Sequence, residues 1–521
     1  MSEFKESKSI TQPTESHASE NNDGQHSLIN GPPEKFELGS MYSDEHSRIE
    51  SEPVSHSAPR DVDWDGPDDV LNPMNWTPGK KWRTLGIISL MTFVTPLSSS
   101  MFAPAVTEVM KGFKSSSTIL GEIVVSIYVL GFAIGPLIIA PMSELYGRKW
   151  IYLISCAAFV IFTMACALSS SMSMLIVFRF LAGCAGSTPV TLGGASIGDM
   201  FPKEKRGAAM AVWGMGPQLA PSVGPIIGGF LAEAEGWRWV FWLQAIIAGI
   251  IMFLGAIILR ETYAPVILQR KTVALIRETG DSGLKSSLQD PTPTSQIFTR
   301  AIIRPIKMLL FSPIVLLLSM YTAIIFGYLY LFITTLPQVF QGQYGFSVGV
   351  SGLTYLGLGI GAILGLMVVG KTSDSMYRKL AARNKDIGVP EHRLPPLLVT
   401  IPLVSIAFFG YGWAVETRTH WSVPMIMTAL FSMGMMPAFI CTNMYFVDAF
   451  GRYSASALAA SKLLQSVVGA FLPLAGRPLF DHLGLGWGNS VLGFIALTFL
   501  PVPWLFFRYG EKLRTRFDVA F

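Results

Sequence analysis

Long apolar segments alternate with short polar ones along this chain from residue 83 onward. Each apolar run holds about 20 residues or more, the length that an α-helix needs to cross roughly 30 Å of hydrocarbon. The pattern predicts twelve membrane-spanning helices, at residues 83–104, 119–140, 150–169, 173–197, 208–232, 239–259, 309–334, 348–370, 396–415, 422–446, 454–476 and 487–507. A longer polar stretch begins at residue 261 and divides the runs six and six, as two fused six-helix repeats would.

The composition supports this interpretation. The 521 residues are 50% hydrophobic and 14% charged, whereas soluble domains carry about 25% charged residues. We therefore expect an all-α integral membrane protein embedded in a lipid bilayer. The net charge of +4 gives no indication of a nucleic-acid partner. The cysteines Cys156, Cys166, Cys184 and Cys441 all lie inside apolar runs, which predicts neither a disulfide framework nor a metal site.

The polar segments set the domain boundaries that we predict. Residues 1–75 should form a disordered cytoplasmic tail, because their composition cannot bury enough apolar surface to fold. Two six-helix bundles follow at residues 76–260 and 304–508, with a cytoplasmic central loop at 261–303 and a short cytoplasmic tail at 509–521. If the N-terminus is inside, the short inner loops hold twelve Lys and Arg residues and the outer loops five. This excess predicts that both termini are cytoplasmic.

One span, within residues 207–230, is unusually rich in glycine and proline. The residues concerned are Gly216, Gly224, Gly228 and Gly229, and Pro217, Pro221 and Pro225. Small residues allow the backbones of two helices to approach closely in lipid, and each proline removes a helical N–H. We expect a bent helix in tight contact with a neighbour. A packing helix without a special role in transport is the alternative.

The loop between the second and third spans carries Glu144, Gly147, Arg148 and Lys149. A carboxylate followed by a Gly-Arg-Lys turn at a helix end can pair with a neighbouring helix terminus and stabilise one conformation. A weaker copy of this pattern, containing Asp374, lies between the eighth and ninth spans. Ordinary cytoplasmic charges at helix ends remain the alternative for that second copy.

Two further residues extend the same cytoplasmic cluster. Asp199 lies at the inner end of the fourth span, and Arg206 opens the fifth. We expect Asp199 either to pair with Arg206 or to be solvated at the helix end.

Charged residues inside a span are costly and are functional candidates by default. Arg179 lies within the fourth span, where it could bias a nearby carboxylate or water or hold an anion; the alternative is an interfacial arginine that snorkels to the membrane surface. Glu122 is the one carboxylate well within a predicted span, so it is a proton-acceptor candidate by elimination. Its shallow depth, near the outer end of the second span, favours solvation at the interface.

Lys462 is expected near the middle of the membrane, about 13 Å into the eleventh span. With Arg179 it would make the cavity cationic, which suggests a weakly acidic or neutral substrate; a structural lysine that snorkels is the alternative. The polar residues Gln218, Gln244, Asn443 and Gln465 also lie in spans. They could bind substrate or hold helices together, and the second role is the commoner one.

Several of these motifs resemble those of the major facilitator superfamily. The spacing of Gly216 and Gly224-Pro225-x-x-Gly228-Gly229 is similar to its antiporter motif, and the segment Glu144 to Lys149 resembles its loop between helices two and three, with glutamate where aspartate is usual. Arg179 resembles the helix-four arginine that is linked to proton transfer. The segment Glu261-Thr262-Tyr263-Ala264-Pro265 is similar to the corresponding sequence of fungal drug and metabolite exporters.

The resemblance implies a function as well as a fold. We expect two six-helix bundles around a central cavity in a monomeric, multi-pass protein of the plasma membrane. It would be a fungal twelve-span drug:proton antiporter that exports a drug, toxin or secondary metabolite, not an enzyme, with the proton gradient in place of a cofactor. A proton-coupled polyamine or nutrient transporter of the same fold is the alternative. The sequence has no Walker-type phosphate loop, which argues against an ATP-driven pump.

Overall fold

The computed structural model describes residues 61–115, 117–202, 205–288, 294–383 and 389–516. The first group of helices comprises α1 (Pro78–Ser100), α2 (Val106–Gly112), α3 (Thr118–Tyr146), α4 (Arg148–Ala167), α5 (Met172–Gly186), α6 (Thr188–Met200), α7 (Arg206–Glu235) and α8 (Trp237–Ile258). The second comprises α10 (Thr294–Phe311), α11 (Pro313–Gly342), α12 (Val348–Leu353), α13 (Leu356–Arg383), α14 (Leu397–Glu416), α15 (Ser422–Phe450), α16 (Ser454–Leu497) and α17 (Pro501–Arg516).

The helices provide the twelve predicted passages through a membrane. Ten segments of the described chain are long and apolar enough to cross a bilayer. One of them, Ser454–Leu513, has room for two passages and is interrupted at Gly484, whose φ is +72°. The 30-residue helix α7, which is not one of those ten segments, completes the set.

Two predicted boundaries differ from the structure because of prolines. The seventh span begins at Pro313 rather than at residue 309, since α10 ends at Phe311 and Pro313 starts a new helix. The twelfth is not continuous to residue 507, because α16 ends at Leu497 and α17 begins at Pro501. Proline has no N–H to continue the preceding helix, but its fixed φ suits the first turn of the next one.

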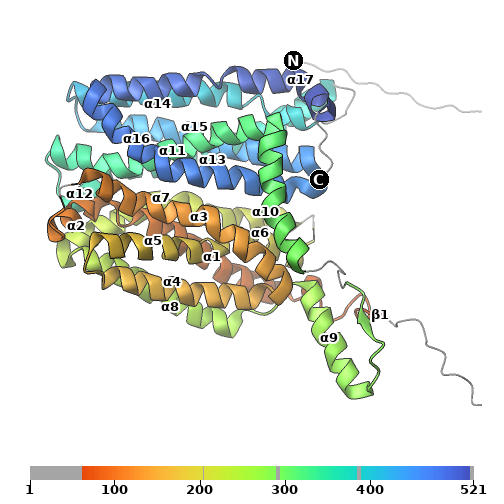
Figure 1. Cartoon of the computed structure of the whole chain (residues 1–521). Helices are drawn as coiled ribbons and strands as arrows, with labels where there is room; N and C mark the ends of the chain where they lie inside the picture. Colours follow the sequence, from red (N-terminus) through yellow and green to blue (C-terminus); the bar gives the residue numbers. More distant parts are fainter. Residues whose placement is uncertain (1–60, 116, 203–204, 289–293, 384–388, 517–521) are drawn as a thin grey trace, which may run out of the picture. The chain divides into compact units, whose positions relative to one another are not determined.

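Each group of helices packs mainly within itself. Figure 1 shows the orange-to-yellow helices gathered in one bundle and the cyan-to-blue helices in another. In the first bundle α3 packs on α5, α4 on α8 and α1 on α7; in the second, α11 packs on α16 and α13 on α15. Contacts between the bundles come chiefly from α3 with α16 and from α7 with α12 and α13. All the described residues belong to one compact unit.

The outward faces of the helices are apolar. On α4, Ile154 and Ile161 are more than 60% exposed, and Phe253 and Ile257 on α8 are equally exposed. A contiguous apolar surface of this kind is unfavourable in water but suits contact with lipid. The protein is thus a multi-pass membrane protein by both its helix lengths and its surface.

The segment before α1 is held by the segment after α8. Strand β1 (Asp61–Val62) pairs in parallel with β2 (Lys285–Ser286), which follows helix α9 (Ala264–Thr279). Lys271 on α9 reaches Asp65 at 2.6 Å and Asp69 at 3.6 Å, and Figure 1 shows α9 and β1 projecting together beyond the helix bundles. The predicted disordered tail at 1–75 is therefore too long, because residues 61–75 are held in place; residues 1–60 lie outside the described residues.

Candidate transport site

Arg179 occupies the interior of the first bundle with 1% of its surface exposed. Its Nη1 donates to the carbonyl of Ser98 at 2.9 Å and its Nη2 to that of Ser99 at 3.1 Å, while Nε donates to the carbonyl of Val124 on α3 at 3.1 Å. The guanidinium also lies 4.8 Å from the centre of the Tyr128 ring. The snorkelling alternative is thus wrong, because the side chain points into the protein.

The end of α1 explains why an arginine is needed there. The last carbonyls of a helix have no partner within it, and α1 ends at Ser100. Arg179 supplies N–H donors to two of these carbonyls and places a positive charge at the negative end of the helix. A side chain of α5 thereby stabilises the point at which α1 stops.

Hydroxyl groups at the same point connect several helices. Ser98 donates to Gln244 Oε1 on α8 at 2.6 Å, and the hydroxyls of Ser99 and Tyr330, on α11 of the second bundle, are 2.9 Å apart. Gln244 Nε2 is buried and has no hydrogen-bond partner in the described structure. Gln244 thus holds helices together with its oxygen while its nitrogen remains available.

Glu122 lies where the two bundles meet. Only 2% of its surface is exposed, and neither carboxyl oxygen has a hydrogen-bond partner among the described residues. A small cavity beside it is lined by Val106, which begins α2, and by Thr334 and Gln338 of α11. Sequence reasoning favoured solvation at the membrane interface, and this was wrong, because depth along a helix does not reveal which face a neighbouring bundle covers.

The backbone of helix α7 comes close to α1 and the residue after it at three glycines. A Cβ atom at Gly228 would collide with the carbonyl of Met101, and one at Gly216 would approach the backbone of Phe93 to 3.2 Å. A Cβ atom at Gly224 would lie 2.6 Å from the hydroxyl oxygen of Ser100. This close approach lets α1 and α7 pack backbone to backbone, as small residues permit in lipid.

The same helix also contacts the second bundle. A Cβ atom at Gly229 would lie 2.8 Å from the carbonyl of Val348, which opens α12. Pro225 is buried and its carbonyl lies against Gly352, whereas Pro217 and Pro221 are half-buried. The helix continues from Arg206 to Glu235 through all three prolines.

Further hydrogen bonds join the bundles at this end of α7. The Glu233 carboxylate accepts hydrogen bonds from the Ser347 hydroxyl at 2.9 Å and from the N–H of Gly349 at 2.5 Å. Gln341 on α11 donates to the carbonyl of Pro104 at 3.2 Å and accepts from Thr107 at the same distance. Polar and backbone contacts therefore join the two bundles at the end that carries Glu233.

Charged residues cluster at the opposite end of the first bundle. Arg148 pairs with Asp199 at 3.4 Å and lies over the ring of Tyr263 at 4.6 Å. Glu261 accepts hydrogen bonds from the backbone N–H groups of Arg148 and Lys149, at 2.8 and 3.3 Å. The start of α4, the end of α6 and the end of α8 are thus joined by one cluster of charges.

The expected pairing of Asp199 with Arg206, or its solvation, was wrong. Arg206 donates instead to the carbonyls of Gly198 and Phe201 at 2.7 Å each, where they end α6. These carbonyls lack helical partners, so the guanidinium caps α6 and leaves Asp199 to Arg148. Glu144 is exposed in the last turn of α3.

The second bundle has a corresponding pair. Arg393 contacts Asp448 at the end of α15 at 3.2 Å and lies over the ring of Tyr377 at 4.3 Å. Each bundle thus joins an arginine, an aspartate at a helix end and a tyrosine. The side chain of Asp374 lies outside the described residues, so its predicted role in this cluster stays a prediction.

The remaining predicted polar residues divide into two groups. Lys462 donates to Gln465 at 3.0 Å, and Gln465 in turn donates to Thr322 on α11 at 3.1 Å. Gln218 and Asn443 are half-buried, and no side-chain hydrogen bond joins them to other described residues. Gln465 is therefore both a link between helices and a partner of the lysine.

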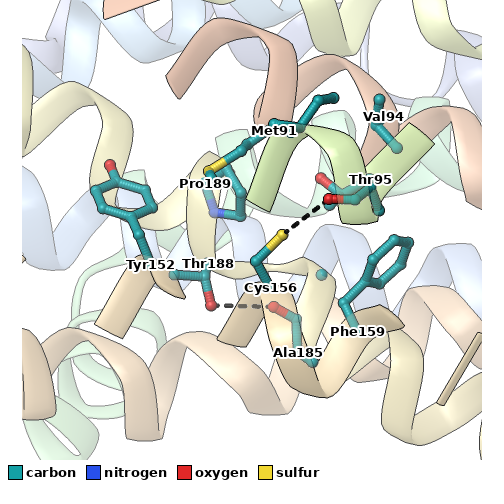
Figure 2. A pocket seen from close by; sticks show the side chains of 12 residues that line it. Met91, Val94, Thr95, Tyr152, Cys156, Phe159, Ala185, Thr188 and Pro189 are labelled. Carbon is teal, nitrogen blue, oxygen red and sulfur yellow. Dashed lines mark hydrogen bonds between the residues drawn. The ribbon is translucent and has the colours of Figure 1, made fainter. Parts of the chain in front are cut away.

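A small apolar cavity lies inside the first bundle, apart from these residues. Figure 2 shows it between Met91 and Thr95 of α1, Cys156 and Phe159 of α4, and Pro189 of α6. It has room for about one water molecule. Its size and apolar walls make it a packing defect and not a substrate site.

Sequence analysis missed four residues of the site. Ser98, Ser99 and Tyr330 were absent from the candidates, although three consecutive serines inside an apolar run are a detectable signal. Glu261 was quoted as part of a motif but given no role. Its capping of α4 depends on a contact between residues 113 positions apart, which spacing does not reveal.

Comparison with known proteins decides the family. The family model described as Major Facilitator Superfamily matches residues 88–473. The chain belongs to the major facilitator superfamily. Among its relatives, the MFS-type transporter penM of Penicillium rubens is 51% identical over 465 residues, covering 89% of this chain and 91% of that protein. The efflux pump radE of Floropilus chiversii is 48% identical over 464 residues, covering 88% and 86%.

Solved structures share the superfamily fold. The xylose transporter XylE from E. coli, in a partially occluded inward-open conformation, matches with a TM-score of 0.63 at 14% identity, covering 82% of this chain and 98% of that one. A bacterial homologue of the lysosomal transporter Spinster matches with a TM-score of 0.58 at 16% identity, covering 85% of this chain and 100% of that one. This member of the superfamily is therefore a membrane transporter of the twelve-helix fold.

Proposed function

We propose that this transporter is an antiporter that exports a small organic molecule, such as a secondary metabolite, toxin or drug, in exchange for protons. It would act in the plasma membrane with both termini in the cytosol and as a monomer. The name of the relative radE, an efflux pump, supports export. The close packing of α7 on α1 through Gly216, Gly224 and Gly228 supports the antiporter interpretation of that helix.

The observation that carries proton coupling is the environment of Glu122. A buried carboxylate without hydrogen bonds is very unfavourable, whereas a neutral carboxylic acid is tolerated. The closed contact between the bundles therefore suits the protonated form, and separation of the bundles would let water reach the group and the proton leave. Such a carboxyl group links its proton to the conformation of the transporter.

Arg179 has a supporting role in this proposal. An arginine does not release its proton under physiological conditions. Its contacts with Ser98 and Ser99 hold the end of α1 in place. The chain that follows contributes Ala103 and Val106 to the wall of the cavity beside Glu122. Arg179 would thus position the proton site instead of carrying the proton.

Closure at one end fits alternating access. The bundles are joined at the end with Glu233 and Gly349, which the predicted orientation places outside the cell. Substrate would enter from the cytosol while this end is closed, and the bundles would then separate there to release it. The membrane potential contributes about 2.3 kcal/mol per charge per 100 mV, and each pH unit about 1.4 kcal/mol.

A yeast strain without its own drug exporters tests the proposal. Expression of the transporter should lower the intracellular amount of at least one compound from a panel of fungicides, organic acids and polyamines. The purified protein in liposomes should then accumulate that compound when a pH gradient is imposed. Accumulation that survives collapse of the gradient, or that needs ATP, would contradict proton-coupled antiport.

The Glu122→Gln variant separates coupling from binding. Its amide imitates the protonated acid but cannot release a proton. We expect this variant to lose accumulation under a pH gradient while retaining exchange of labelled for unlabelled compound without a gradient. Loss of both activities, or of neither, would remove Glu122 from the proton pathway.

A further inference from the structure

The side chain of Lys462 has an environment that the packing of α16 does not explain. It lies eight residues after Ser454, about 12 Å along the helix. The residue is exposed, yet its ammonium group lies beside Gln465 of α16 and the ring of Phe439 of α15, both of which are buried. Buried neighbours on two helices place the ammonium group on the inner side of α16 and not on the side that faces lipid.

The ammonium group is only partly satisfied. Its Nζ donates to Gln465 Oε1 at 3.0 Å and lies 5.6 Å from the centre of the Phe439 ring. No ion pair joins Nζ to a carboxylate within the described part of the chain. An ammonium group has three N–H donors, so two remain for a ligand.

Neighbouring residues fix the single contact that Lys462 makes. Gln465 Nε2 donates to the hydroxyls of Thr322 and Ser461 at 3.1 and 3.0 Å. Both donor positions of this amide are thereby used, and its oxygen is turned toward Lys462. The lysine is consequently held in place without being neutralised.

Aromatic side chains continue from the lysine toward the centre of the protein. The Phe439 ring is 6.2 Å from that of Phe326, which is 5.1 Å from that of Tyr330. The Tyr330 hydroxyl reaches Ser99, whose carbonyl binds Arg179. Apolar and π surface thus extends from one interior cation toward another.

We propose that Lys462, oriented by Gln465, binds the negatively charged group of the transported molecule, and that Phe439 and Phe326 contact its planar apolar body. A charge inside a membrane protein is stabilised mainly by an opposite charge, and the described residues near Lys462 supply none. The ligand class is an organic acid with an aromatic or conjugated body. This inference names the substrate class and so rests on the proposed export function.

The test is binding to the purified full chain in detergent without any gradient, so that a failure of proton coupling does not affect it. Three probes share a naphthalene body and differ in charge: naphthoate, naphthamide and naphthylmethylammonium. A charge-assisted hydrogen bond contributes about 1.5–3 kcal/mol, so naphthoate should bind at least about tenfold more tightly than the amide. The cation should bind least.

Variants assign the effect to one residue. Lys462→Met should reduce the preference for naphthoate over naphthamide to about none, and Lys462→Gln should do the same if the methionine variant does not fold. Lys462→Arg should retain the preference, and Lys307→Met, which removes an exposed lysine from α10, should leave it unchanged. Equal binding of the three probes, no binding of naphthoate, or an unchanged preference in both neutral variants would overturn the proposal.

Discussion

The carboxylate of Glu261 caps the N-terminus of α4 by accepting the backbone N–H of Arg148 at 2.8 Å. Arg148 begins α4 and Glu261 follows the end of α8, and the chain turns at Gly147, directly before Arg148, where φ is +90°. A Cβ atom at Gly147 would collide with the Glu261 carboxylate. The turn, the cap and the Arg148–Asp199 pair therefore depend on one another.

Glu261→Ala should destabilise this end of the first bundle. The change leaves the N–H groups of Arg148 and Lys149 without their acceptor, and loss of a helix cap costs about 1 kcal/mol. The negative charge of Glu261 near the N-terminus of α4 is lost as well, and its interaction with the helix dipole contributes about 0.3–1 kcal/mol of stability. Thermal unfolding of the purified variant should show a lower melting temperature, with Glu261→Gln intermediate. Identical melting of Glu261→Ala and the unmodified protein would disprove the cap.

Gly228→Ala should reduce export while the protein still reaches the membrane. The added methyl group meets the carbonyl of Met101, so α1 and α7 have to move apart; such overpacking costs about 1–3 kcal/mol. Gly214→Ala is the matched control, because nothing lies within 4 Å of a Cβ atom there on the same helix. Efflux measurements and surface labelling distinguish the two. Equal efflux by both variants would mean that the close contact has no role in transport.

Arg179→Lys should impair both transport and stability. A lysine ammonium cannot reach carbonyls on α1 and α3 in the fixed geometry of a guanidinium. Buried carbonyls without partners cost about 1–3 kcal/mol each. We expect lower thermal stability, and slower exchange of substrate even without a pH gradient. A residue concerned only with proton transfer would leave gradient-free exchange intact, so normal exchange would refute a positioning role.

Lys271→Met should release the segment before α1. Backbone N–H groups of Asp65 and Leu71, together with Lys271, lower the pKa of Asp69 below its ordinary value. The carboxylate is therefore ionised at neutral pH, and its pairing weakens only when the pH falls through that lowered pKa. Hydrogen exchange of residues 61–75 should become faster in the variant at neutral pH. The same exchange rate as in the unmodified protein would show that the strand pairing suffices alone.

The sequence predicted the helices well and their contacts poorly. Apolar runs, prolines and glycines act locally, so the twelve passages and the close face of α7 could be predicted from them. The partner of Asp199 could not, because Arg206 had a competing use at the end of α6. Nor could the burial of Glu122, which depends on α11 of the other bundle. Lys462 stood out as an interior charge, but its orientation by Gln465 needed the fold.

The pairing of β1 with β2 has a mechanical consequence. It joins the chain just before α1 to the chain just after α9. The segments that enter and leave the first bundle are therefore bonded to each other. In the alternating access proposed above, this pairing would keep both segments with the first bundle. The hinge between the two bundles would then lie after Ser286, and α9 would move with the first bundle.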